Sequence, residues 1–101
     1  MKTTINEEDG KFVVTLEGRL DTAAADQTVK DIAPLYEKKG RDIVIDCQEL
    51  SYISSSGLRI LLGIRKHAGE TGNTVTILHM NNDIKSVFQM TGFINLFTIQ
   101  D

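Results

Sequence analysis

Hydrophobic residues recur along the chain with two spacings, one typical of strands and the other of helices. Short runs rich in β-branched and aromatic residues predict strands at residues 3–6, 12–16, 43–45, 75–78 and 97–99. Asp9-Gly10 is a turn signal between the first two runs, so the chain is expected to open with a β-hairpin. The run Ile43–Ile45 has no polar alternation, which favours a central strand covered on both faces.

The segment between the second and third predicted strands carries apolar residues at the spacing of one helical face. These residues are Ala25, Val29, Ile32, Ala33 and Tyr36. Asp21 or Thr22 is the expected N-cap of this helix, and Gly40 is its expected stop. Pro34 lacks a backbone donor and would clash with the preceding turn, so we expect a kink near it or a second short helix starting there.

Two further helices are predicted in the second half of the chain. One covers the apolar segment from Leu58 to Ala68, and the other is short and capped by Asn81 or Asn82. The spacing of the short helix favours core positions for Phe88 and Met90. After the hairpin, strands alternate with helices, which predicts an α/β domain with right-handed crossovers and a parallel central sheet.

Composition is that of one small soluble domain, with 101 residues, 41% of them hydrophobic and 25% charged. Eleven Lys and Arg against fourteen Asp and Glu give a net charge of −3 without a basic cluster, so no nucleic acid partner is expected. A single cysteine cannot form an internal disulfide, and no signal segment opens the chain, which favours the cytoplasm. No apolar run approaches the ~20 residues that cross a bilayer, so direct membrane insertion is not expected.

Loops that leave parallel strands gather at the carboxyl edge of a sheet, and here they carry Asp21, residues 54–57 and residues 79–82. Two observations argue against a serine hydrolase. Ser54 replaces the first glycine of a Gly-x-Ser-x-Gly turn, and His67 lies ~16 Å along the helix from Ser56.

His79 opens on the same edge, and we expect an exposed loop or strand-end histidine there. Cys47, expected to be a semi-buried small residue, and the two isolated histidines lack the spacing of metal ligands. No glycine-rich phosphate loop occurs in the sequence. We therefore expect a chain that is not an enzyme and that needs no cofactor of its own.

Three motifs in matching order resemble those of STAS domains, the sulfate transporter and anti-sigma factor antagonist family. Asp46 to Leu62, with Ile53-Ser54-Ser55-Ser56-Gly57-Leu58, looks like the family signature. Gly18-Arg19-Leu20-Asp21 is similar to the Gly-x-Leu-Asp of bacterial anti-anti-sigma factors, and Phe88-Gln89-Met90-Thr91-Gly92 to their Phe-x-Met-[Ser/Thr]-Gly. The resemblance implies one STAS domain over residues 1–101, with a mixed sheet, a parallel core, an N-terminal antiparallel hairpin and about three main helices.

The same resemblance implies an anti-sigma factor antagonist that works by partner switching. In the family, the serine before the glycine accepts a phosphate from an anti-sigma factor with serine kinase activity, which implies Ser56 as acceptor, with Ser55 as the alternative. Ser54 stands where the family usually has Asp. The expected partner-binding residues are Asp21, Ser54, Ser55, Gly57 and Leu58. A phosphatase would restore the form that binds the anti-sigma factor and frees a sigma factor for transcription.

A helix N-terminus suits such a switch, because its unpaired N–H groups and partial positive charge accommodate a phosphate. The added negative charge would then weaken a contact surface fitted to a neutral hydroxyl. Two alternatives stay open. The serines could serve only as a helix cap, as Asp21 could at the first long helix. Otherwise the chain could be a STAS subunit of a lipid-transport complex or a stressosome-like scaffold that binds partners without a phosphorylation switch.

Overall fold

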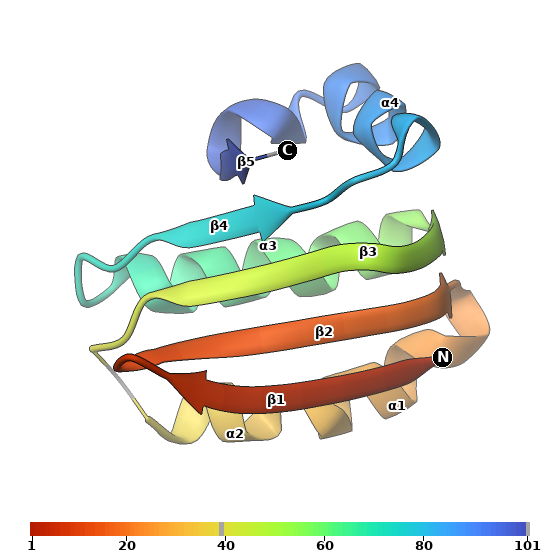
Figure 1. The fold of residues 1–101 in the computed structure, drawn as a ribbon. Helices are drawn as coiled ribbons and strands as arrows, with labels where there is room; N and C mark the ends of the chain where they lie inside the picture. The colour runs from red at the N-terminus through yellow and green to blue at the C-terminus, as the bar shows by residue number, and fades with distance from the viewer. Residues whose placement is uncertain (39, 101) are drawn as a thin grey trace.

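A computed structural model describes residues 1–38 and 40–100, and within them five strands form one sheet in the order β1-β2-β3-β4-β5 (Figure 1). The strands are β1 (Lys2–Glu8), β2 (Lys11–Leu20), β3 (Ile43–Ile53), β4 (Val75–Leu78) and β5 (Thr98–Gln100). β1 and β2 are antiparallel, and each later strand is parallel to the one before it, which confirms the predicted sheet. The hairpin turns at Asp9 and Gly10, whose φ angles of 52° and 77° are both positive, as in a type I′ turn.

The helices lie between the strands in the predicted order. They are α1 (Thr22–Asp31), α2 (Ala33–Glu37), α3 (Ser55–Gly69) and α4 (Asn82–Met90), followed by a short 3₁₀ helix, η1 (Phe93–Leu96), that the hydrophobic pattern does not indicate. Pro34 lies in the first turn of α2, where its missing N–H breaks no helical hydrogen bond, so the predicted second short helix is confirmed. α2 ends at Glu37, before the predicted stop at Gly40. Figure 1 shows α1, α2 and α3 together behind the sheet, with α4 and η1 beyond β4.

The first helical segment buries a face that overlaps only in part with the one predicted. Ile32 is buried as predicted, together with Thr28 and Leu35, whereas Val29 is 53% and Tyr36 42% exposed. The two candidate faces are neighbours, offset by one residue or about 100° around the helix, so spacing alone does not separate them. Thr28 tolerates burial because its hydroxyl donates to a backbone carbonyl one turn earlier, at 3.0 Å.

β3 runs to Ile53, well beyond the predicted end at Ile45. Its pairing with β2 shifts register twice, and each shift inserts one extra residue into β3. The buried side chains of Cys47, Leu50 and Ile53 are therefore three residues apart instead of two. Because strands are recognised by a period of two, this spacing does not predict a strand after Ile45. With its full length, β3 ends at Ile53, immediately before the first serine.

The central strand is covered unequally on its two faces. Ile43 and Ile45 are buried, but Val44 between them is only half-buried, so the prediction that both faces are covered is wrong. Cys47 is fully buried rather than semi-buried. Its burial, with a smaller contribution from the charge of Asp46, raises the pKa of the Cys47 thiol to about 12, which keeps it protonated and unreactive at neutral pH.

α4 places one of its two predicted core residues inside and the other outside. Phe88 is fully buried and packs edge-on against Phe97, with ring centroids 5.8 Å apart. Met90 is 85% exposed, so its predicted core position is wrong. Two residues correspond to ~200° around a helix, which places Met90 on the side of α4 opposite Phe88.

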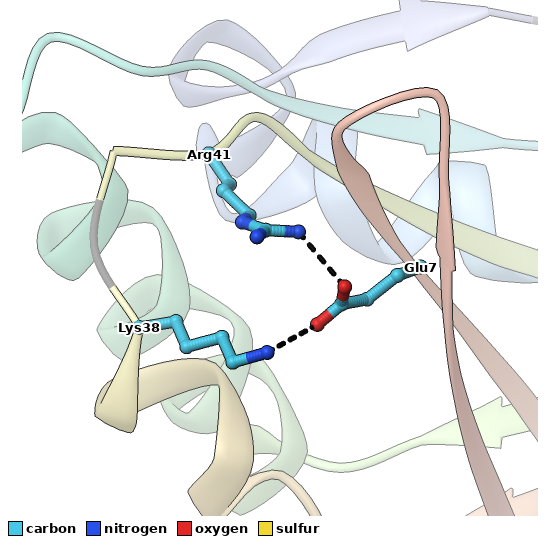
Figure 2. A network of polar contacts seen from close by, with 3 residues as sticks. All are labelled: Glu7, Lys38 and Arg41. Atoms are coloured by element: carbon cyan, nitrogen blue, oxygen red, sulfur yellow. Dashed lines mark hydrogen bonds and ion pairs between the residues drawn. The ribbon is translucent and has the colours of Figure 1, made fainter.

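A polar network joins β1 to the segment that follows α2 (Figure 2). Glu7 accepts hydrogen bonds from Lys38 Nζ at 2.7 Å and from Arg41 Nη1 at 3.0 Å. The bond from Lys38, aided by the charges of Arg41 and Lys38, holds the pKa of Glu7 below its ordinary value. Because the three side chains are partly exposed to water, the network positions this end of the sheet more than it stabilises the fold.

Candidate functional site

Two helices begin side by side at the carboxyl edge of the sheet. Leu20 of β2 pairs with Ile53 of β3, so the next residues along each strand, Asp21 and Ser54, are neighbours across the edge. Asp21 is the N-cap of α1 and accepts a hydrogen bond from the N–H of Ala24 at 2.9 Å. Ser54 is the N-cap of α3, and its hydroxyl accepts the N–H of residue 57 at 3.2 Å. Both expected caps are therefore present, and the backbone joins them through a 2.9 Å bond from the Ser54 N–H to the Leu20 carbonyl.

The next two serines lie in the first turn of α3 and not in a loop. Ser55 is exposed and Ser56 is half-buried. Among residues 1–38 and 40–100, no side-chain hydrogen bond engages either hydroxyl, and the first turn of α3 contains no acidic residue. Unpaired N–H groups and the partial positive charge of the helix are thus available beside two unengaged hydroxyls.

Gly57 and Leu58 are buried beneath the serines, and Leu58 is only 4% exposed. A Cβ on Gly57 would lie 2.7 Å from Leu20 Cγ and 2.8 Å from Ile53 Cγ1, far inside van der Waals contact. The glycine therefore lets α3 approach both strands closely, which fixes the height of the serines above the sheet. Any part that Gly57 and Leu58 have in partner binding would act through the position of the helix end.

Arg19 and Tyr52 form a stacked pair beside the two caps. The sequence analysis did not predict this pair. The guanidinium of Arg19 lies 4.3 Å from the centroid of the Tyr52 ring, and its Nε is 3.9 Å from Asp21 Oδ2. Tyr52 is 41% exposed, and arginine over an aromatic ring is typical of protein interfaces. Arg19 and Tyr52 are direct partners in the parallel pairing of β2 with β3. The sequence would reveal the pair only if both predicted strands were extended to the carboxyl edge of the sheet.

The two histidines lie in separate surroundings. His79 is 45% exposed at its side chain, and its Nδ1 is 3.1 Å from Asp46 Oδ1, which confirms the predicted exposed strand-end position. The ring of His67 packs against that of Tyr36, with centroids 4.7 Å apart. In the part of the chain that the structure describes, no three His, Cys, Asp or Glu side chains gather as metal ligands. The described helices include none with both the length and the apolar character needed to cross a membrane.

Comparison of the sequence with known proteins identifies its family. The chain matches the STAS domain family over residues 2–101. It is 30% identical over 99 residues to BtrV of Bordetella bronchiseptica, described as a candidate anti-sigma factor antagonist, with 98% of this chain and 85% of the relative covered. It is 24% identical over 94 residues to the anti-sigma-B factor antagonist of Staphylococcus aureus strain NCTC 8325, covering 93% and 87% of the two chains.

A solved structure shares the fold. The Bacillus cell fate determinant SpoIIAA in its phosphorylated form superposes with a TM-score of 0.74 at 20% sequence identity, covering 99% of this chain and 92% of the other. The mixed five-stranded sheet and its helices are thus the arrangement found in that protein.

Proposed function

This chain belongs to the STAS domain family, and from that premise we propose that it is an anti-sigma factor antagonist that works by partner switching. In the unphosphorylated form it binds an anti-sigma factor with serine kinase activity, and the sigma factor is released. Phosphorylation of Ser56 ends that binding, and a phosphatase restores it. The chain itself holds the acceptor and the contact surface, and the kinase requires ATP, the phosphate donor, and Mg²⁺. The proposal thus assigns the protein to the cytoplasm with the transcription machinery.

The observation that carries the proposal is the state of the first turn of α3. Among the described residues no side-chain hydrogen bond engages the Ser56 hydroxyl there, and no carboxylate opposes a dianion in that turn. A phosphate adds about −1.5 to −2 charges at neutral pH, and a helix N-terminus favours such a charge. The domain can therefore accept the modification without unfolding.

The same phosphate changes the contact surface strongly. Asp21 lies at the neighbouring helix cap, so a phosphate on Ser56 would add a second anionic group to this edge. A partner surface fitted to neutral hydroxyls would then have to desolvate and match these charges. A hundredfold loss of affinity corresponds to ~2.7 kcal/mol, which like-charge contacts at an interface readily reach.

Mass spectrometry of the protein after incubation with purified candidate anti-sigma factor kinases, ATP and Mg²⁺ tests the proposal. We expect one phosphate on Ser56 in the wild type and none on Ser56→Ala. Ser55→Ala is the matched control, because it removes the adjacent hydroxyl and should leave phosphorylation intact. Phosphate on Ser55 in the wild type would move the acceptor by one residue.

A second outcome separates the switch from simple binding. If a kinase that is active on another substrate binds this chain tightly but transfers no phosphate to any serine, the switch is wrong. The chain would then be a binding subunit of a transport complex or scaffold, for which the serine in place of the family Asp at position 54 is the supporting feature.

A further inference from the structure

An apolar groove runs between the α1–α2 segment and α3. Its volume is about 490 Å³, and its walls are Val29, Ile32, Ala33, Tyr36, Arg59, Ile60 and Gly63. Val29 and Tyr36, on one wall, are 53% and 42% exposed. Within the described residues, no other element fills the space between these walls, so apolar side chains face water along its length.

The exposed wall reverses the usual preference of residue types for the interior. Val29 lies outside while its neighbour Thr28, a polar residue, is 2% exposed in the core. Val29 and Tyr36 belong to an apolar stripe with the spacing of a buried helical face, yet both remain exposed. A stripe of this kind on a folded domain indicates a contact surface.

The shape of the groove depends on a glycine. A Cβ on Gly63 would lie 3.1 Å from Tyr36 Oη, so the missing side chain is what lets the tyrosine lie against α3. The Tyr36 ring is also held by His67, with ring centroids 4.7 Å apart. The groove is therefore formed in the free protein and does not have to open for a ligand.

The groove is continuous with the serine edge along α3. Arg59, Ile60 and Gly63 follow Ser56 at three, four and seven residues, which places all four on one helical face. At 1.5 Å per residue, Gly63 lies ~10 Å along the axis from Ser56. An interface of ordinary size buries ~800 Å² on each partner, a patch of about 16 Å radius, so one centred on Ser56 would include the groove.

The lining residues also specify the chemistry of the occupant. Arg59 is exposed and is the one charged residue among the groove's lining, and no ion pair engages it in the described part of the chain. We infer that the anti-sigma factor inserts an amphipathic helix into this groove, with its apolar face on Val29, Tyr36 and Ile60 and a carboxylate opposite Arg59. Apolar grooves between helices commonly bind partner helices in this way. The inference rests on the proposed function, since it names a second contact of the same partner.

Calorimetric titration with a purified anti-sigma factor kinase that phosphorylates this chain tests the inference. Mg-ADP replaces ATP during the titration, so that binding is measured without phosphate transfer. Val29→Glu should weaken binding at least tenfold, because it places a carboxylate in the apolar wall, and Arg59→Glu should weaken it to a similar extent. The matched control is Leu96→Glu, an equivalent change at a residue that is 37% exposed on η1, outside the groove.

The design distinguishes failure of the inference from failure of the proposed function. If Ser56→Asp abolishes binding while Val29→Glu and Arg59→Glu bind like the wild type, the groove is not part of the interface. If no anti-sigma factor kinase binds or phosphorylates the wild type, both proposals are wrong. Thermal melting of each variant shows that weakened binding does not come from unfolding. Sedimentation completes the test, because a wild-type dimer that Val29→Glu dissociates would assign the groove to a second copy and overturn the inference.

Discussion

The helices α1 and α3 begin side by side at one edge of the sheet, yet their first residues differ in charge. Asp21 caps α1 with a carboxylate that also lies 3.9 Å from the Arg19 guanidinium. Ser54 caps α3 with a hydroxyl, and the hydroxyls that follow it are neutral. The α1 end thus already carries a negative charge, whereas the α3 end would gain one only through the phosphorylation proposed above. Two equivalent positions in the fold therefore differ in charge, and under the proposed function one has a structural role and the other a regulatory one.

Gly57 marks the α3 end, because its missing side chain lets α3 pack closely against Leu20 and Ile53. Gly57→Ala should lower the free energy of unfolding by ~1–3 kcal/mol, since the new Cβ would overlap the buried Leu20 and Ile53 side chains. Urea denaturation measures this change. Gly69→Ala is the matched control in the same helix, where no atom lies within 4 Å of a new Cβ, so it should be neutral or slightly stabilising. Equal stability of the two variants would mean that α3 can shift away from the strands at little cost.

The caps themselves give a smaller effect. Asp21→Ala and Ser54→Ala should each cost ~1 kcal/mol, because each leaves a helical N–H without its acceptor. Ser54→Asp should instead add ~0.3–1 kcal/mol at pH 7 by placing a charge at the α3 N-terminus, as α1 already has. Thermal melting at low and high salt is the measurement, and salt should reduce the gain of Ser54→Asp but not the loss of Ser54→Ala. A Ser54→Asp variant no more stable than the wild type at low salt would contradict the electrostatic difference drawn between the ends.

The smallest expected effect is on the pH dependence of stability. It concerns Asp42, a carboxylate that precedes β3 at the end opposite the helix caps and, like Asp21, accepts a backbone N–H. Asp42 accepts the Thr74 N–H at 2.9 Å and an Asn73 amide hydrogen at 3.1 Å. The backbone bond from Thr74, followed by that from Asn73, holds the pKa of Asp42 below its ordinary value of 3.8.

Because folding lowers the pKa of Asp42, its contribution to stability is present above the unfolded-state value of about 4 and is lost as the pH falls through the folded-state value. Asp42→Asn should therefore reduce the acid dependence of stability below about pH 5 and leave the slope near pH 7 unchanged. Denaturation curves collected across this range measure the effect. An unaltered acid limb in the variant would show that other carboxylates account for it.

Local pattern determined most of the elements, because hydrophobic spacing, caps and turn residues act within a few positions of one another. The Asp9-Gly10 hairpin, the short helix with Pro34 in its first turn and the caps at Asp21 and Asn81 follow from such short-range signals. The pattern did not indicate the true length of β3, since its two register shifts depend on pairing with β2. The wrong core positions have the same origin, because Met90 differs from Phe88 only by its direction around α4.

For the candidate site, the sequence by itself determined the serines, their position at a helix start and the adjacent Asp21, all carried by motifs of contiguous residues. Only the tertiary structure decided that Asp21 and Ser54 are neighbours, that Gly57 faces inward and that Arg19 covers Tyr52. It also decided which of two adjacent stripes of the α1–α2 segment enters the core, leaving Val29 and Tyr36 along a groove. The physical reason is that helical spacing identifies an apolar stripe, whereas its burial depends on which surface of another element is placed against it.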